Sequence, residues 1–552
     1  MVERRAFDRF RFGDRAVRCD SESTVPVGSP ETLVTMLDRE EFFPTPTAAE
    51  ECRANLGDSV ANLALALLAR RVLWREFDGT PRPTDAPDRP AAEESALFDR
   101  LTVGGHPLHP GAKTRRNLSP TDALSFAPEF TDSIPLRFVA VRRDRAREES
   151  ADDATLTDRL YEQFPGLRAA VGDTVPGDAA DYAVVVVHPH QFRTVVHDRY
   201  ADARSAGIVV PVSDYARPAT PLLSLRTVSP HPSGTSGATP PHLKLALNVL
   251  TTSSVRTLSP QAAVTGPRAS ALLRSLCKRE SFESFGVLRE LASTCYHPPG
   301  GPHVEGDGYD DVRNLSALAR QRPATHELVS DDEGVVTAAS LLARPPVGEE
   351  SVLSAVLDAY ASGSGHTDRP AAVEAFLREY LDAVVPGPLA LLVKHGVGLE
   401  AHLQNSYVVF DEGRPTASLM SDFGAVRIRE PRLADAALEP YPGSEVYADP
   451  DVVRGELWNT LVQHHLGELV GRLSAAEPVA ATDCWSLVRE RCERVFERLA
   501  ADDSVPESRV RSDRESLFAD RIGHMSMTET WFRDEAEYRR TTVRNPLATG
   551  GQ

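Results

Sequence analysis

Lysine is almost absent from this chain of 552 residues, in which only four lysines accompany 57 arginines. Aspartate and glutamate together number 80, so the formal net charge is −19. This excess of negative charge repels nucleic-acid phosphates and anionic lipids, and no basic stripe interrupts it, so neither nucleic acid nor a membrane is expected as a partner. A high-salt habitat or a GC-rich genome would remove lysine from neutral positions. The surviving lysines are therefore informative: Lys113, Lys244, Lys278 and Lys394.

The sequence also lacks long apolar runs and paired cysteines. The longest helical apolar run, residues 63–69, is far shorter than the ~20 residues that a membrane-spanning helix needs. The start, MVERRAFDRFRF, has no apolar core, so no secretory signal is expected. The six cysteines form no CxxC pair and no zinc-like spacing, which argues against a disulfide scaffold or a structural metal. These absences favour a cytoplasmic protein.

Hydrophobic periodicity predicts an α+β fold with mixed sheets and a helical C-terminal segment. The length suggests two to four lobes at the usual ~100–200 residues per domain. Helices are expected over most of 1–78, from Ala91, within 146–180, and at 371–385, 451–475, 484–501 and 508–523. Strands are expected at 134–141, 182–187, 208–212, 222–228 and 242–252, and in a hairpin between 408 and 420.

The densest group of polar residues lies in one turn and the hairpin that follows it. EAHLQN contains Glu400, His402, Gln404 and Asn405, and the hairpin leads to Asp422 in a DFG triplet. Protein kinases use an Asn followed by Asp-Phe-Gly to hold magnesium against ATP phosphates with hard oxygen ligands. The pattern predicts a metal–nucleotide site. The alternative is that these groups end strands and that DFG is only a turn.

A proline-stiffened loop, GGHPLHPGAKTRR, gathers imidazoles and cations. His106 and His109 precede Lys113 and Arg115, where an anionic substrate could bind. The alternative is a surface loop with incidental histidines. A second pair of histidines, in HPHQ (188–191), follows a buried strand and is expected to cap it.

A second cationic group is expected on neighbouring strands. Ser224 and Arg226 would share one face of a strand, Lys244 begins the next, and Thr252 and Arg256 end it. A hydroxyl, an ammonium and two guanidiniums describe a cradle for polyphosphate or polycarboxylate. No Walker GxxxxGK[ST] loop is present, so side chains rather than loop amides would hold phosphate.

Six motifs in this order resemble the aerobactin synthetase-like NRPS-independent siderophore (NIS) synthetase family. The motifs are GHPxHPxxKxR (105–115), HPxQ (188–191), SxRT (224–227), K-x7-TSSxR (244–256), EAHxQN (400–405) and DFG (422–424). The resemblance implies a cupped hand with a thumb-like region (1–135), a fingers-like region (136–345) and a palm-like region (346–552). It also implies a homodimer, because relatives commonly form dimers.

The resemblance implies siderophore biosynthesis with ATP and Mg²⁺. A carboxylate, citrate or a citrate derivative, is adenylated and then condensed with an amine or hydroxyl of a polyamine, hydroxylated amine or amino acid, giving an amide or ester. The residues that match the family's nucleotide and metal positions are Ser224, Arg226, Lys244, Glu400, Asn405 and Asp422, the last three as metal ligands. The residues that match substrate positions are His106, His109, Lys113, Thr252, Arg256, His402 and Gln404. Of these, His109, Arg256 and His402 are assigned to catalysis.

Two positions depart from the family pattern. Ser421 stands where the family often has Arg, which would remove a phosphate or carboxylate contact, and Asn117 stands where it has Gly, which predicts a changed turn. Two rival functions use the same residues. A small-molecule kinase shares Asn-then-DFG, but no HxD precedes Asn405. A binding protein for citrate or ferric citrate would use the cations but would not need Glu400, Asn405 and Asp422.

The charge and the arginine bias generate a prediction about salt. Activity and melting temperature should rise from low salt to molar KCl, because screening relieves repulsion among surface carboxylates. Calorimetric melting and a product assay across this range test it. A melting temperature that stays flat would attribute the bias to genome composition.

Overall fold

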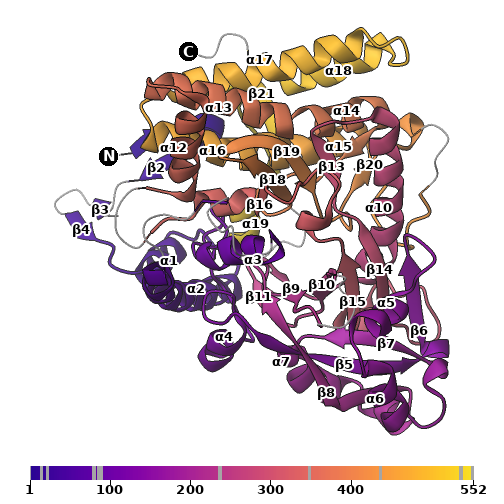
Figure 1. Ribbon diagram of the computed structural model, residues 1–552. Helices are drawn as coiled ribbons and strands as arrows, with labels where there is room; N and C mark the ends of the chain where they lie inside the picture. Colours follow the sequence, from indigo (N-terminus) through magenta and orange to yellow (C-terminus); the bar gives the residue numbers. More distant parts are fainter. Residues whose placement is uncertain are drawn as a thin grey trace.

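The computed structural model describes residues 2–12, 17–19, 24–76, 82–83, 91–233, 239–345, 350–433, 438–533 and 539–548. It confirms an α+β fold in which two main sheets, one of eight strands and one of four, lie in different halves of the molecule (Figure 1). Each sheet has its own large hydrophobic cluster of buried side chains. None of the helices in the described ranges is long and apolar enough to cross a membrane.

The eight-stranded sheet is antiparallel throughout, in the order β6-β14-β15-β10-β9-β8-β5-β7. All six residues of β7, YAVVVV, are buried, because helices cover the sheet. Its strands are β5 (Ile134–Arg142), β6 (Ala146–Ser150), β7 (Tyr182–Val187), β8 (Val209–Pro221), β9 (Thr227–Pro230), β10 (His242–Leu245), β14 (Glu290–Tyr296) and β15 (Ser316–Arg320). The helices beside it include α5 (Leu156–Gln163), α6 (Leu167–Thr174), α10 (Pro260–Glu280) and α11 (Gly306–Asn314).

The four-stranded sheet contains the predicted hairpin, which is confirmed. β18 (Ser406–Asp411) and β19 (Arg414–Met420) are antiparallel, with β16 (Gly334–Thr337) beside β18 and β13 (Phe285–Val287) parallel to β19. Helices from before and after the hairpin in the chain form the upper part of the molecule in Figure 1. They are α12 (Val352–Ser364), α13 (Arg369–Val384), α14 (Pro386–His395), α15 (Pro450–Leu457), α16 (Gly467–Ala476), α17 (Ala481–Ala500) and α18 (Glu507–Leu517).

The N-terminal region is helical only in part. The helices predicted within 1–78 and from Ala91 are confirmed as α1 (Pro30–Arg39), the long α2 (Pro46–Leu73) and α3 (Ala91–Leu101). Before α1 the structure has short strand pairs, β1 (Val2–Arg4) with β2 (Phe10–Phe12) and β3 (Val17–Cys19) with β4 (Thr24–Pro26), so the helical prediction is wrong there. A tertiary contact explains the difference, since Phe7 is buried against Trp485 with ring centroids 5.2 Å apart.

Two strand predictions near the site are wrong in part. The segment 222–226 forms a turn and β9 begins at Thr227, while β10 ends at Leu245 and only the short strands β11 (Leu250–Thr251) and β12 (Ser254–Val255) follow. Leu223 and Leu225 alternate with Ser224 and Arg226 as in a strand, but Leu225 is buried within the turn. Leu225 has φ 68°, a left-handed conformation that no strand allows. The turn matters because it carries Ser224 and Arg226.

The C-terminal segment adds a strand pair that the sequence did not predict. The helix expected over 508–523 ends at Leu517, and β21 (Arg521–Ser526) pairs with β22 (Arg539–Arg544). Elements that are short complete the chain: α4 (Pro120–Phe126), α7 (Pro189–Gln191), α8 (His197–Arg199), α9 (Ala201–Ser205), β17 (Val397–Gly398), β20 (Arg427–Ile428) and α19 (Met527–Arg533). A π-helical segment, Trp458–Leu466, joins α15 to α16.

Candidate functional site

A cleft of about 800 Å³ lies between the two main sheets. Its lining includes Lys244 on β10 and Arg320 on β15 from the eight-stranded sheet, and Tyr407 on β18 with Asp422 directly after β19 from the four-stranded sheet. The structure brings every site residue predicted from the sequence to this lining except His109, which lies just behind it. The lining residues are His106, Lys113, Ser224, Arg226, Lys244, Thr252, Arg256, Glu400, His402, Gln404, Asn405 and Asp422.

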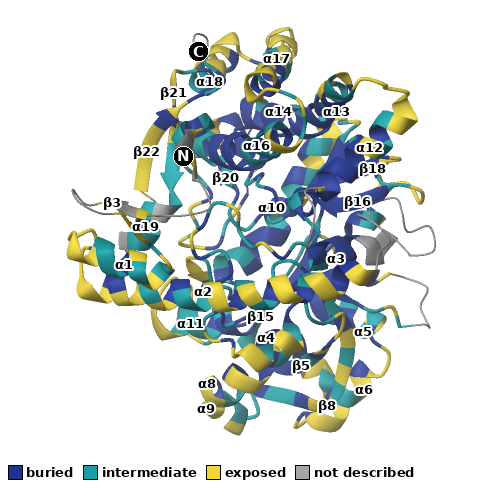
Figure 2. Cartoon of the chain, turned by 90° about the vertical axis from the view of Figure 1, so that its left-hand side faces the viewer, coloured by how far each residue is buried: buried dark blue, intermediate teal, exposed yellow. Residues whose placement is uncertain are grey.

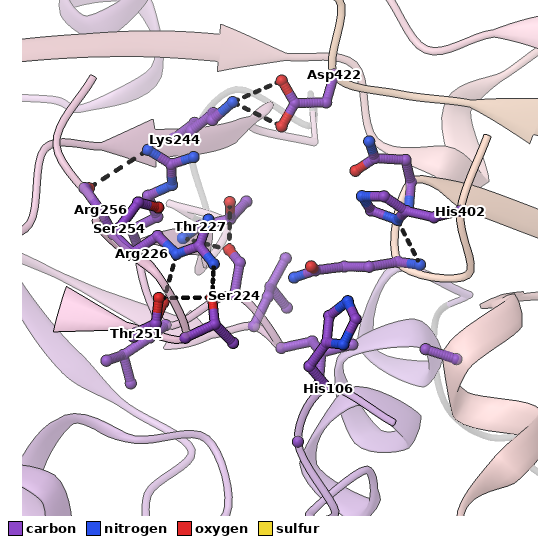
Figure 3. Close-up of a pocket in the computed structure, with 18 of the residues that line it drawn as sticks. His106, Ser224, Arg226, Thr227, Lys244, Thr251, Ser254, Arg256, His402 and Asp422 are labelled. Carbon is purple, nitrogen blue, oxygen red and sulfur yellow. Dashed lines mark hydrogen bonds and ion pairs between the residues drawn. The ribbon is translucent and has the colours of Figure 1, made fainter. Parts of the chain in front are cut away.

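An ion pair crosses the middle of the cleft (Figure 3). Lys244 Nζ donates to both carboxylate oxygens of Asp422, at 2.7 and 2.6 Å, and Arg320 Nη2 lies 3.5 Å from the same carboxylate. Burial alone would raise the pKa of Asp422, but Lys244, Arg320 and Arg226 hold it well below its usual range. Asp422 also has φ 72°, a conformation rare outside glycine and asparagine. The carboxylate is therefore ionised and presented from a constrained backbone.

The turn that carries Ser224 and Arg226 is held by its own hydrogen bonds. Ser224 Oγ accepts the Thr227 N–H at 3.1 Å and donates to Thr227 Oγ1 at 2.8 Å. Arg226 donates to the carbonyls of Thr257 at 2.6 Å and Arg256 at 3.3 Å. Burial lowers the pKa of Arg226 to about 10, which still leaves the guanidinium charged near neutral pH. The prediction that Ser224 and Arg226 share a strand face is wrong, but the turn brings both to the cleft.

Arg256 is oriented by the hydroxyls of the loop between β11 and β12. Its Nη2 donates to Thr252 Oγ1 at 2.9 Å, and its Nε donates to Thr251 Oγ1. Thr252 has φ 53°, so this loop also contains a left-handed residue. Arg256 thus presents a planar guanidinium to the cleft, in a form suited to bidentate contact with a carboxylate.

The EAHLQN stretch forms the opposite wall. Asn405 Nδ2 donates to the Glu400 carbonyl at 3.1 Å, and no described residue donates to its Oδ1. His402 Nδ1 accepts the Gln404 N–H at 3.2 Å, while its Nε2 lies 3.5 Å from a Glu400 carboxylate oxygen. Burial lowers the pKa of His402, but Glu400 and the more distant Asp422 and Glu456 outweigh burial and leave that pKa raised.

The histidines of the proline-stiffened loop are neutral. Burial and neighbouring cationic groups lower the pKa of His106 to about 3 and that of His109 to about 4. His109 Nδ1 accepts the Gly111 N–H at 3.0 Å, so its Nε2–H points to Ser253 Oγ at 2.9 Å. Ser253 lines the cleft and His109 does not, so His109 is hydrogen-bonded to the lining through this hydroxyl and packs edge-on against His106.

The cation of Lys113 is already paired. Lys113 Nζ lies 3.1 Å and Arg115 Nη2 2.8 Å from the same buried oxygen of Glu129. Lys113 lines the cleft, yet its positive charge is neutralised by Glu129 rather than left for a substrate. The loop also rests on α2, because Asp58 Oδ2 accepts the Arg115 N–H at 2.6 Å and Ser59 Oγ accepts the Lys113 N–H at 3.0 Å.

The two departures from the family pattern have local explanations. Asn117 has φ 69°, a glycine-like conformation that asparagine tolerates, and the change of turn stays a prediction. Ser421 is buried and donates to the Asn405 carbonyl at 3.2 Å. It thus ties the end of β19 to Asn405. The structural role expected for HPHQ is confirmed, but buried His188 caps the helix α7 rather than the strand β7, by accepting the His190 N–H at 3.1 Å.

The sequence did not predict three charged groups that lie near the predicted site residues. Arg320 bonds to Glu290 at 2.9 Å as well as reaching Asp422. The sequence contains a signal for Arg320, because this residue is a lone arginine at the end of the apolar segment SALAR. In the sheet Arg320 lies opposite His242 and on the same face as Lys244. Asp99 lines the cleft from α3, and burial together with the Glu400 carboxylate raises the pKa of Glu456 to about 7. Neither of these lies in a motif.

Comparison with known proteins gives two family matches. Residues 95–343 match the model described as the IucA / IucC family. Residues 374–540 match the model described as ferric iron reductase FhuF-like transporter. The two cysteines in the second range, Cys484 and Cys492, are both buried.

Curated relatives cover most of the chain. D-ornithine–citrate ligase of Staphylococcus aureus is 26% identical and covers 98% of this chain and 83% of its own. Staphyloferrin A synthase of the same organism is 23% identical and covers 89% of this chain and 82% of its own.

Solved structures show the same fold. ATP-bound aerobactin synthetase IucA of Klebsiella pneumoniae superposes with a TM-score of 0.77 at 18% identity, over 99% of this chain and 92% of that one. Petrobactin biosynthesis protein AsbB of Bacillus anthracis has the same TM-score and identity, over 99% and 86%. With six motifs in order, a family model that matches residues 95–343 and relatives that cover 98% and 89% of this chain, the chain belongs to the IucA / IucC family of NRPS-independent siderophore synthetases.

Proposed function

We propose that this enzyme uses Mg-ATP to adenylate a carboxylate of the citrate class and then joins it to an amine or hydroxyl, as a step of siderophore biosynthesis. The observation that carries the proposal is the arrangement of charges in one cleft. The cationic groups of Arg226, Lys244, Arg256 and Arg320 line one wall, and Glu400, Asn405 and Asp422 line the other. Two anions, a polyphosphate and a polycarboxylate, need such an excess of cations if they are to react with each other.

The first half-reaction joins two negatively charged groups. A carboxylate oxygen attacks the α-phosphorus of ATP, the bond from that phosphorus to the bridging oxygen breaks, and pyrophosphate leaves. Ser224, Arg226 and Lys244 would hold the phosphates, while Arg256, oriented by Thr251 and Thr252, would hold the carboxylate. Neutral His106 would donate a hydrogen bond without adding charge.

The second half-reaction needs a general base rather than additional positive charge. The amine nitrogen attacks the acyl carbon, the carbon–oxygen bond to AMP breaks, and the amine loses a proton. His402 is the better base, because Glu400 and its other acidic neighbours keep the pKa of its imidazole above the usual value. His109 would act only through Ser253. Relatives such as D-ornithine–citrate ligase suggest an amino acid as one class of acceptor.

The donor set fits magnesium that is shared with a substrate. No group of three or more His, Cys, Asp or Glu side chains within the described ranges could hold a metal ion by itself. Glu400, Asp422 and the Asn405 Oδ1 are hard oxygen donors on one wall, and Mg²⁺ is normally bound by one or two carboxylates together with phosphate oxygens. When bound, Mg²⁺ would neutralise phosphate charge. Lys244 would then form its ion pair with phosphate instead of with Asp422.

A homodimer, which the resemblance implies, is part of the same proposal. The outer face of α2 supports it, because Val60, Leu68 and Val72 are 48%, 61% and 58% exposed on a helix whose other face packs on the site loop (Figure 2). Exposed Glu50 and Glu51 lie near the start of this helix and exposed Arg71 lies near its end, so two copies could pair antiparallel with opposite charges facing.

Product analysis tests the proposed reaction directly. Incubation with citrate, Mg-ATP and hydroxylamine should yield AMP, pyrophosphate and a citryl hydroxamate, because hydroxylamine intercepts the activated acyl group. ADP without AMP would support the kinase alternative. AMP that forms only when a citrate monoamide is supplied would keep the chemistry and place the enzyme at a later step.

The Asp422→Asn variant should lower turnover at least ~100-fold, equivalent to ~2.7 kcal/mol of barrier. The reason is that the amide keeps the shape but loses the charge that faces metal and Lys244. Asp122→Asn is the matched control, because Asp122 pairs with Arg193 outside the cleft and should stay within ~3-fold of wild type. A folded Asp422→Asn enzyme with near-normal turnover would remove Asp422 from the metal site.

The Arg256→Lys variant should raise the KM for the carboxylate at least ~10-fold and more than the KM for ATP. Lysine keeps the positive charge but loses the planar fork that the two threonine hydroxyls orient. Steady-state kinetics with each substrate varied in turn gives both constants. Equal increases in the two KM values would move Arg256 to the nucleotide end of the cleft.

A further inference from the structure

A buried carboxylate outside every sequence motif holds the phosphate-facing turn. Asp99, on α3, is only 4% exposed and lines the cleft. Its Oδ2 accepts the Leu223 N–H at 3.1 Å, and its Oδ1 accepts the Thr337 hydroxyl at 3.2 Å and the Ser340 hydroxyl at 3.5 Å. No Lys, Arg or His of the described chain forms an ion pair with it, so hydrogen bonds alone satisfy this carboxylate.

The donors to Asp99 come from both halves of the site. Leu223 lies in the turn between β8 and β9 of the eight-stranded sheet, directly before Ser224. Thr337 ends β16 of the four-stranded sheet, and Ser340 follows in a short 3₁₀ segment. Thr102, at the end of α3, donates to Ser340 Oγ at 3.2 Å and strengthens the same link. One side chain therefore sets the position of the turn relative to the opposite sheet.

The turn needs external support, because its backbone is strained. Leu225 has φ 68°, and a branched residue in this conformation persists only where the surroundings enforce it. One support is burial of the Leu225 side chain in a small apolar cluster with Leu118, Ala123 and Leu247. A second is the pair of bonds from Arg226 to the Thr257 and Arg256 carbonyls. A third is the Leu223 N–H bond to Asp99, on the side of the turn that faces the four-stranded sheet.

We propose that Asp99 is a positioning residue, which holds Ser224 and Arg226 at the distance from Asn405 and Asp422 that a bound nucleotide requires. This inference rests on the proposed function, because it assigns the turn to the phosphates of ATP. Burial raises the pKa of Asp99 to about 6, against the opposing effect of its three donors. A neutral group that still accepts the Leu223 N–H should therefore serve nearly as well as the carboxylate.

Calorimetric titration of the full chain with Mg-ATP tests this role. In Asp99→Ala, which removes both acceptor oxygens and with them all three hydrogen bonds, the Kd for ATP should rise at least ~10-fold while the stoichiometry of binding stays at the wild-type value. In Asp99→Asn the Kd should stay within ~3-fold of wild type, because the amide oxygen accepts the Leu223 N–H and the hydroxyls can accept from the amide. Ser95→Ala, which trims another buried polar side chain of the same helix, is the matched control and should leave the Kd unchanged.

The stoichiometry separates positioning from a merely structural role. A variant that only unfolds loses binding sites but keeps the Kd of those that remain, and that result for Asp99→Ala would overturn the proposal. If Asp99→Ala cannot be purified, the double variant Thr337→Val/Ser340→Ala decides, because it cuts only the link to the four-stranded sheet. Its Kd should rise at least ~5-fold, and an unchanged Kd would overturn the proposal. Wild-type protein that binds no ATP would overturn the proposed function and this inference together.

Discussion

The ion pair of Lys244 with Asp422, extended by Arg320, is the interaction on which the site depends. It joins the eight-stranded sheet to the four-stranded sheet across the cleft, with the lysine almost fully buried. Taking such charges out of water costs several kcal/mol per ion unless partners compensate, so each group must always have a counter-charge. In this structure Lys244 and Asp422 neutralise each other. In the proposed reaction Lys244 pairs with phosphate and Asp422 pairs with magnesium. A compact ammonium on a flexible stem suits this exchange, which explains a lysine in a chain that otherwise uses arginine.

Around this pair the site is built from turns rather than strands. Leu225, Thr252 and Asp422 all line the cleft, and all have left-handed backbone conformations that ordinary side chains avoid. Such strain persists only where packing and hydrogen bonds enforce it, and it is characteristic of functional sites. Here Asp99, Ser224 and the hydroxyls that orient Arg256 supply the enforcement. The free-energy cost of these backbone conformations is offset by the packing of the two large hydrophobic cores behind them.

The sequence predicted the residues of the site better than their backbone. Motif order placed Lys244, Arg256 and Asp422 in one cleft, and the hairpin before DFG was readable from its turn residues. The turn at 222–226 was not, because Leu223 and Leu225 imitate strand alternation while the burial of Leu225 depends on tertiary contacts. The pairing of Lys113 with Glu129 and the bonds of Asp99 were also unreadable, since their partners lie in other segments of the chain. Periodicity describes a local environment, and these features are long-range.

In the proposed reaction, a carboxylate oxygen of the substrate becomes bonded to the α-phosphorus of ATP in this cleft. The most direct measurement uses a citrate-class substrate labelled with ¹⁸O in its carboxylates, together with Mg-ATP and an amine acceptor. Attack on the α-phosphorus followed by amide formation must leave one labelled oxygen in the phosphate group of AMP, and mass spectrometry of the nucleotide products should find it there. Label in inorganic phosphate, with ADP as the nucleotide product, would contradict attack on the α-phosphorus.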